Sequence, residues 1–266
     1  MVEKTLVMTK LPDLPVLVEL LQVIEQVFIS LGKDPDYVEG MRMAVPGAGR
    51  LYGVKVPQLR KLSKEIVKKY GKEEESIRDF AEACWSVGSR EHELVALFLL
   101  ANISLTPSER WEVGVRFIPD VSNWESCDQL CMALLGQALA EDPQYMDTLE
   151  TWIEHENFWV RRAALVAPVY LRRAKYLPEV AADLDRRTLE MAAHLLNDEE
   201  KYIRKAVDWT VREVLKRQYG MGYKWLKMQA QSYPSKIARS TLRLASKKLS
   251  ENDQTYFLTL LEIDQD

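Results

Sequence analysis

The sequence has almost no strand pattern and few of the residues that metal or covalent chemistry requires. Its three cysteines cannot form a paired disulfide framework, and Cys127 and Cys131 have the spacing of helical neighbours, unlike the C-x-x-C of redox or zinc motifs. We interpret the cysteines as reduced, small apolar residues. The three histidines, His92, His155 and His194, lie far apart and no cysteine pair completes a ligand set, so neither a metal nor a cofactor is expected.

Long apolar runs and phosphate-binding loops are missing as well. No stretch approaches the ~18 apolar residues of a membrane span, and the start "MVEKTLVMTKLPDLP" has acids and prolines where a secretory signal needs an apolar centre. No glycine-rich phosphate loop or nucleophile elbow occurs. These absences predict a soluble intracellular protein that uses neither a metal nor a covalent triad.

Amphipathic helix patterns fill most of the 266 residues, 47% of which are hydrophobic. "VPQLRKLSKEIVKKYG" has Pro57 in a first helical turn, apolar residues on one stripe and Gly71 as a cap. Similar patterns predict helices over 14–31, 76–87, 89–103, 107–118, 123–140, 143–153, 157–170, 185–196, 199–219, 223–231, 235–249 and 253–261. The stretch "RMAVPGAGRLYG", with three glycines and a proline, is the one most expected to be irregular.

An internal repeat indicates how these helices are arranged. "WVRRAALV" (159–166) and "YIRKAVDW" (202–209) share their aromatic, cationic and apolar positions at an offset of 43 residues, a period that fits helix pairs of the HEAT kind. Each pair exposes an apolar face that its neighbours must cover. The sequence therefore predicts an all-α fold, an α-α superhelix (solenoid) of HEAT-like repeats with a concave surface, formed as a single domain over 1–266.

Charge is unevenly distributed along the chain. The net charge is −4, yet residues 155–248 hold 20 Lys+Arg against 10 Asp+Glu, whereas residues 1–154 hold 16 against 25. One reading is a basic binding surface on one part of the fold, and the other is a set of solvated, lysine-rich helix faces. Charge alone slightly favours the second reading.

Three helical segments carry aromatic and charged residues that could form a site. In "SNWESCDQLC", Trp124 and Asp128 are four residues apart and share one helix face. "FWVRRAA" contains Arg162, and "KAVDWTVRE" contains Trp209 beside Asp208, which interrupts the apolar pattern of the paired repeat. Taken singly, each has an ordinary explanation: a core tryptophan, an acid near a helix start, an arginine paired with an acid. Their combination favours a functional site.

These segments resemble the AlkD-type DNA alkylation-repair glycosylases, which are built of HEAT-like repeats. The resemblance runs from "LYGVKVPQLRKL" through "VGSREHELVALFLL", "SNWESCDQL" and "ENFWVRRAAL" to "EKYIRKAVDWTVREVLK" and "PSKIARSTLRLASKKL". It implies that Trp124, Asp128, Arg162 and Trp209 line the lesion site, whereas a tyrosine expected near "MRMAVPGAGRL" has Met43 as its nearest position.

The resemblance implies a monofunctional hydrolase that cleaves the N-glycosidic bond of N3-alkyladenine and N7-alkylguanine in duplex DNA. Alkylation makes the purine a good leaving group, so the enzyme must mainly stabilise a cationic sugar and orient water. Asp128 would do both as the catalytic carboxylate, and Trp124 and Trp209 would add cation-π attraction of about 0.5–2 kcal/mol each. Arg162 would hold a phosphate near the lesion.

Cations of the repeat helices are expected to line the concave groove and follow the phosphates of double-stranded DNA with alkylated bases. They are Arg161, Arg162, Arg204, Lys205, Arg212, Lys236, Arg239 and Arg243. We expect a cytoplasmic monomer, associated with the nucleoid when bound to DNA, with no membrane partner. Two alternatives stay open: a repeat protein that binds damaged or branched DNA without catalysis, and a protein-interaction scaffold.

Overall fold

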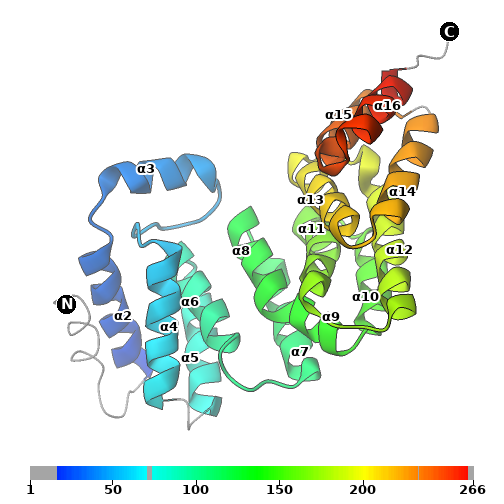
Figure 1. Cartoon of the computed structure of the whole chain (residues 1–266). Coiled ribbons are helices and arrows are strands. Elements are labelled where there is room, and N and C mark those ends of the chain that lie inside the picture. Colours follow the sequence, from blue (N-terminus) through cyan, green and yellow to red (C-terminus); the bar gives the residue numbers. More distant parts are fainter. Residues whose placement is uncertain (1–16, 71–73, 233, 263–266) are drawn as a thin grey trace. The chain divides into compact units, whose positions relative to one another are not determined.

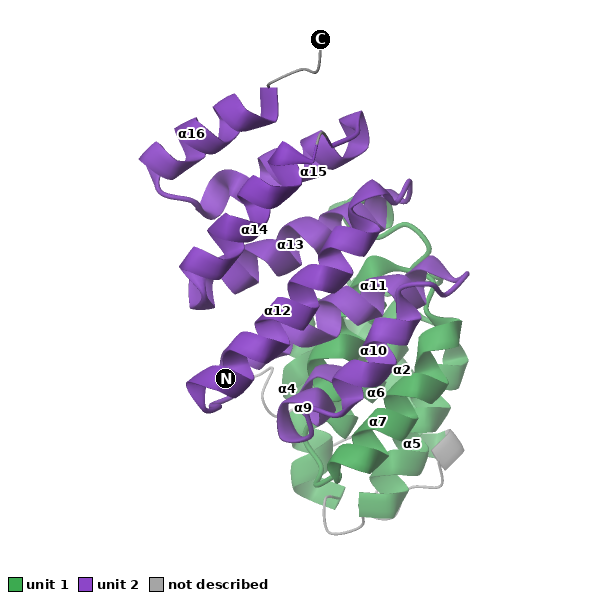
Figure 2. Ribbon diagram, turned by 90° about the vertical axis from the view of Figure 1, so that its right-hand side faces the viewer, with its two compact units in different colours: residues 1–134 green, residues 135–266 purple. Residues whose placement is uncertain are grey.

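The computed structural model describes residues 17–70, 74–232 and 234–262, and helices dominate these ranges (Figure 1). No β-strand occurs in them; the nearest feature is a pair of isolated bridges from Gly49 and Arg50 to Ser89. The predicted all-α class is therefore confirmed. The chain forms two compact units, unit 1 (Met1–Leu134) and unit 2 (Leu135–Asp266), coloured separately in Figure 2. A single domain over 1–266 stays a prediction.

Unit 1 is organised around one buried helix. Its α-helices are α2 (Leu17–Leu31), α3 (Pro35–Ala44), α4 (Val56–Tyr70), α5 (Glu74–Val87), α6 (Arg90–Leu100), α7 (Pro107–Phe117) and α8 (Trp124–Leu130). Helices α4, α5 and α8 pack against α6, and every residue of α6 is buried. Its first turn, "REHE", therefore brings four polar side chains into the interior, where each needs a partner.

Unit 2 consists of two layers of helices. Its α-helices are α9 (Gly136–Glu141), α10 (Tyr145–Trp152), α11 (Phe158–Val166), α12 (Pro178–His194), α13 (Lys201–Arg217), α14 (Tyr219–Gln231), α15 (Lys236–Ala245) and α16 (Glu251–Glu262). In one layer α13 packs between α11 and α15, and in the other α14 packs between α12 and α16 (Figure 2). The two segments of the predicted repeat lie on α11 and α13, which are neighbours. The helical repeats are therefore confirmed within this unit.

Several predicted helices are shorter or more divided than their patterns indicate. The predicted helix 123–140 consists of α8, a π-helical segment (Cys131–Leu135) and α9. The predicted helix 157–170 ends at Val166 and continues as a 3₁₀ segment (Ala167–Arg173), since Pro168 lacks the N–H that an α-helix would use. Gly71, predicted as a cap, and the first residues of the predicted helix 14–31 lie outside the described residues.

Helix α3 is absent from the predicted set of helices. It begins with Asp34, whose side chain accepts a hydrogen bond from the N–H of Tyr37, and with Pro35 in its first turn. It buries none of its residues, so the hydrophobic period that predicts the other helices is missing. The connection that follows, residues 45–55 (the α3–α4 segment), is irregular as predicted. None of the described helices has the length and apolar character needed to cross a membrane.

Candidate functional site

The stretch "SNWESCDQLC" forms α8 and the residues on either side of it. Asn123 caps the helix, because its side chain accepts a hydrogen bond from the N–H of Ser126 at 2.9 Å. Trp124 is half-buried, and Asp128 is 9% exposed. The indole and the carboxylate are therefore carried one turn apart on the same short helix, as the spacing predicts.

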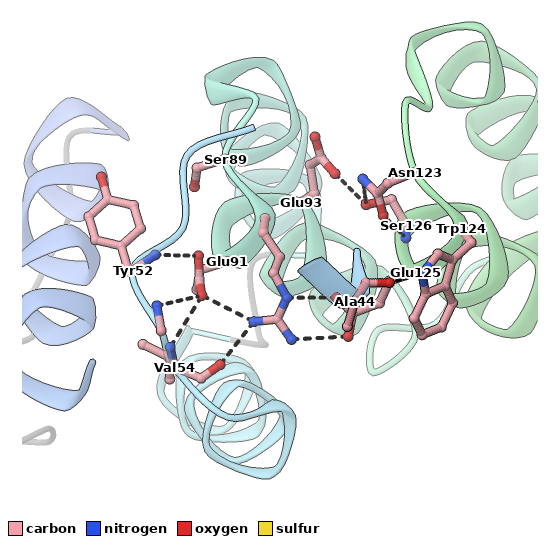
Figure 3. Close-up of polar contacts among 12 residues, drawn as sticks. Ala44, Tyr52, Val54, Ser89, Glu91, Glu93, Asn123, Trp124, Glu125 and Ser126 are labelled. Atoms are coloured by element: carbon pink, nitrogen blue, oxygen red, sulfur yellow. Dashed lines mark hydrogen bonds and ion pairs between the residues drawn. The ribbon is translucent and has the colours of Figure 1, made fainter. Parts of the chain in front are cut away.

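The α3–α4 segment is fastened to the start of α8. The indole Nε1 of Trp124 donates to the carbonyl of Ala44 at 2.8 Å (Figure 3), and the hydroxyl of Ser122 donates to the carbonyl of Gly47 at 2.7 Å. Gly47 has φ +86°, and a Cβ at this position would lie 2.3 Å from the carbonyl oxygen of Ser122. Glycine is therefore required for this close approach. The orientation of the Trp124 ring is fixed by a backbone group rather than by packing alone.

A buried network of charges holds the other end of the same segment (Figure 3). Glu91 on α6 accepts hydrogen bonds from three consecutive backbone N–H groups, those of Tyr52, Gly53 and Val54, at 3.0–3.2 Å. Arg90 donates to the carbonyl of Val54 at 3.0 Å and to Glu91 at 3.1 Å. Because these groups are removed from water, the fully satisfied network rigidifies the segment.

Arg90 connects this network to α8. Its Nε and Nη2 donate to the two carboxylate oxygens of Glu125 at 2.6 and 3.0 Å, and Arg90 is 1% exposed. Such a two-point contact fixes direction as well as distance. Glu125 follows Trp124 directly, so the pair sets the position of the first turn of α8. This network was not predicted. Its residues lie in the segments "SREHE" and "NWE", but their contacts join residues that are 35 to 39 positions apart in the sequence.

A second buried carboxyl, that of Glu93, contacts the first turn of α8. Glu93 is 8% exposed and forms a short hydrogen bond with the hydroxyl of Ser126, which also accepts from the amide of Asn123 at 3.0 Å (Figure 3). Burial raises the pKa of Glu93 to about 7, although the hydrogen bonds from Ser126 and Asn123 oppose the rise. This carboxyl therefore changes charge near neutral pH.

Arg162 lies in the interior of unit 2. It is 4% exposed, and its Nη1 donates to the carbonyl of Tyr202 at 2.5 Å, which joins α11 to α13. Phe158, Trp159 and Tyr202 form an aromatic cluster beside it, with ring centroids 4.6–6.3 Å apart. The phosphate contact that the resemblance implies for Arg162 stays a prediction.

Trp209 is half-buried on α13, and charged residues surround its polar edge. Its Nε1 donates to Glu213 at 3.3 Å, and Glu213 also pairs with Lys216 at 2.6 Å and with Arg172 at 3.3 Å. Burial alone would raise the pKa of Glu213, but the hydrogen bond from Lys216 and the neighbouring cations hold it below its ordinary value. Glu213 therefore stays ionised and fixes the indole. Its role was not predicted.

Most of the cations predicted to follow DNA phosphates have partners within unit 2. Their contacts are Arg161 with Asp198 and the carbonyls of His155 and Glu156, Arg204 with the carbonyl of Glu199, Arg212 with Asp208, Arg239 with the carbonyl of Pro234, and Arg243 with Glu262. Lys205 and Lys236 are exposed and have no acidic partner in the described part of unit 2. These two lysines carry the least compensated charge of the predicted set.

No group of three or more metal-ligating side chains occurs among residues 17–70, 74–232 and 234–262. All three cysteines are free and buried, as interpreted from their spacing. Burial raises the pKa of the Cys84 thiol well above its ordinary value, which keeps it protonated.

The family model described as "DNA alkylation repair enzyme" matches residues 24–249, and the chain therefore belongs to this family. Among solved structures, a predicted DNA alkylation repair enzyme from Enterococcus faecalis is similar, with a TM-score of 0.65, 23% identity, and coverage of 83% of this chain and 98% of its own. AlkD2 from Streptococcus mutans has a TM-score of 0.56, 19% identity, and coverage of 80% and 97%. At these identities the likeness shows a shared fold. A comparison with curated proteins finds no match.

Proposed function

We propose that this chain is a monofunctional DNA glycosylase that hydrolyses the N-glycosidic bond of N3-alkyladenine and N7-alkylguanine in duplex DNA. Membership of the DNA alkylation repair enzyme family supports a role in this chemistry. The observation that carries the proposal is the pairing of Trp124 and Asp128 on α8, a short helix whose first turn is held by the Arg90–Glu125 ion pair.

A cationic alkylated purine sets a limited task for the enzyme. The base carries a positive charge and leaves readily, so no general acid is needed to protonate it. As the bond breaks, positive charge moves to the deoxyribose, and a water molecule must attack the sugar carbon. A carboxylate near the sugar lowers the energy of that charge and accepts a proton from the water. Asp128 is the residue we assign to both tasks.

Trp124 is assigned the neighbouring aromatic role. Its indole N–H is already occupied by the carbonyl of Ala44, so its contribution to the substrate would be made by the ring face. The electron-rich face attracts the cationic lesion and sugar, worth about 0.5–2 kcal/mol. In unit 2, we propose that Trp209 supplies a second aromatic face and that Arg162 contacts a phosphate.

Release of free N7-methylguanine from methylated duplex DNA, measured by mass spectrometry under single-turnover conditions, tests the proposal. We expect Asp128→Asn to slow release by about 10² or more, because it keeps the shape and removes the charge. Asp79→Asn is the matched control: it makes the same change at an exposed position on α5 and should leave the rate unaltered.

The other outcomes discriminate between functions. Wild-type protein that binds duplex DNA and releases no base would support the DNA-binding alternative. Equal release by the wild type and by Asp128→Asn would show that another group carries the reaction.

A further inference from the structure

Many of the cations of unit 1 lie on one helix. Residues 1–134 contain 16 Lys+Arg and 20 Asp+Glu, yet six of these cations lie between Lys55 and Lys69, where Glu65 is the single acid. Helix α4, with the residue that precedes it, is thus strongly basic within an acidic unit. A count over the whole of residues 1–154 is net acidic, so it does not reveal this basic helix.

The cations of α4 lie on the face turned to solvent. The helix buries Leu59, Leu62, Ser63 and Ile66, on the side that packs against α6. Four cations occupy the opposite side and are all exposed: Arg60, Lys61, Lys64 and Lys68, which we call the basic stripe. Since three of them follow at intervals of four residues, they form a row along the helix.

Among the described residues of unit 1, two lysines of the stripe lack the acidic partners that exposed arginines elsewhere in the unit have. Arg42 pairs with Glu39 at 2.8 Å, and Arg116 pairs with Glu82. In contrast, Lys64 and Lys68 have no acidic partner in the described part of unit 1, and Lys61 approaches Glu65 only to 3.9 Å.

Uncompensated cations in this arrangement have a cost. Like charges at i, i+4 destabilise a helix by about 0.2–0.5 kcal/mol per pair. The helix dipole favours Lys68 in the last turn, but it offers nothing to Lys61 and Lys64, which lie before that turn. A bound polyanion would remove the repulsion.

One end of the stripe lies beside the helix that carries Asp128. The guanidinium of Arg60 stacks over the ring of Phe98, 4.0 Å from its centroid, and its Nη2 donates to the side chain of Gln129 at 2.8 Å. Gln129 is the residue after Asp128 on α8. The row of charges therefore begins next to α8 and continues along α4 to Lys68.

We propose that the basic stripe of α4 binds the phosphate backbone of a DNA strand; the choice of DNA as the polyanion rests on the proposed function. Lysine ammonium groups act as mobile point charges, so they hold phosphates without reading the bases. The stripe thereby gives unit 1 a phosphate contact of its own, in addition to the cations predicted in unit 2.

Salt dependence of binding to undamaged duplex DNA, followed by fluorescence anisotropy, tests this proposal. The double variant Lys64→Gln/Lys68→Gln should bind on the order of tenfold or more weakly near 0.1 M salt, and the slope of log affinity against log salt should shrink by about 1.8. The matched control is Arg116→Gln/Arg186→Gln. It removes the same charge at exposed positions that are already paired with acids, and it should keep the wild-type slope.

The outcomes separate this proposal from the proposed function, since undamaged DNA contains no lesion. If the wild type excises N7-methylguanine but the α4 double variant keeps the wild-type slope, the α4 surface is wrong and the glycosylase proposal stands. If the wild type binds DNA through α4 without releasing a base, the glycosylase proposal is wrong and the α4 proposal stands. Absence of binding by the wild type, or an equal loss of slope in the control, would overturn the α4 proposal.

Discussion

Arg90 and Glu125 form a buried two-point ion pair that joins α6 to α8. The two hydrogen bonds measure 2.6 and 3.0 Å, and neither side chain is more than 9% exposed. The third guanidinium nitrogen, Nη1, donates to Glu91 and to the carbonyl of Val54. A desolvated pair of this kind adds little net stability compared with apolar residues, but its geometry is strict. It therefore specifies where α8 begins.

Breaking the pair from one side should be costly. Glu125→Gln leaves the Arg90 guanidinium with one acidic neighbour in the interior, and we expect the free energy of unfolding to fall by about 3 kcal/mol in urea titrations. The double variant Arg90→Met/Glu125→Leu should lose less than the sum of the single variants. Strictly additive losses would mean that the two residues do not act as a pair.

Glu93 should make stability depend on pH. Its pKa in the folded protein is about 7, above its ordinary value of 4.5, so the folded state holds the proton more tightly than the unfolded state. Its contribution is complete below about pH 4.5 and is lost as pH rises through 7. Glu93→Gln keeps a hydrogen-bonding group without titrating, and its stability relative to the wild type should rise by up to about 3 kcal/mol from pH 4.5 to 8. A pH-independent difference would contradict the assignment.

His92 should make stability depend on pH in the opposite direction to Glu93. Burial lowers its pKa to about 4, and its ring packs against Phe28 and Tyr52 with centroids 5.0 and 5.8 Å away. The unfolded state takes up the proton first, so stability is lost as pH falls from about 6.5 towards 4. We expect His92→Gln to reduce this acid sensitivity in the same unfolding experiments. Between about pH 4.5 and 6.5 the wild-type curve should be flatter than that of either variant.

The indole of Trp124 has two separable functions. Trp124→Phe keeps an aromatic face and removes the hydrogen bond to the carbonyl of Ala44, so it should cost about 1 kcal/mol of stability and leave most of the excision rate. Trp124→Ala also removes the ring, and release of N7-methylguanine should fall on the order of tenfold. If both variants excise at the same rate, the aromatic face makes no contribution.

Gly47 and Gly88 offer a controlled test of the docking of the α3–α4 segment. Both have positive φ, +86° and +70°, so alanine at either site pays a backbone penalty of about 1–2 kcal/mol. A Cβ at Gly88 would meet nothing within 4 Å, whereas one at Gly47 would meet the carbonyl of Ser122 at 2.3 Å. Gly47→Ala should therefore destabilise by at least about 1 kcal/mol more than Gly88→Ala in urea unfolding. Equal losses would show that the segment moves away from α8 without cost.

The sequence predicts those parts of the fold that have a local period. Helices such as α4 and α13 repeat their apolar residues every three to four positions, and the structure has them close to their expected bounds. The start of α12 at Pro178 precedes the expected 185, and it is marked by the proline and by Glu179 in the first turn. Helix α3 has no buried face, so the signals available for it were the residues at its start, the cap Asp34 and Pro35.

Contacts between distant residues leave no comparable pattern. The spacing of Trp124 and Asp128 places them correctly on one helix, but nothing local links "REHE" to Glu125 or to the backbone at 52–54. Likewise, Asp198 neutralises Arg161 from 37 positions away. Charge counting therefore indicated a basic region in residues 155–248, but it could not separate cations that have acidic partners from those that lack them, and it did not detect α4.

The main chain of the α3–α4 segment makes many of the hydrogen bonds that attach it, in addition to the buried side chains of Val45, Tyr52 and Val54. The carbonyls of Gly47 and Val54, and that of Ala44 at the end of α3, accept hydrogen bonds from side chains of α6 and of the start of α8, and the N–H groups at 52–54 donate to Glu91. Of the exposed side chains of the segment, Pro46 takes no part in those bonds, whereas Arg50 pairs with Glu25 at 3.1 Å and lies over the ring of Tyr52. The side chain at position 46 is therefore free to vary while these main-chain hydrogen bonds are kept. This makes the segment a place where new contacts could be introduced by substitution without rebuilding the helices that support it.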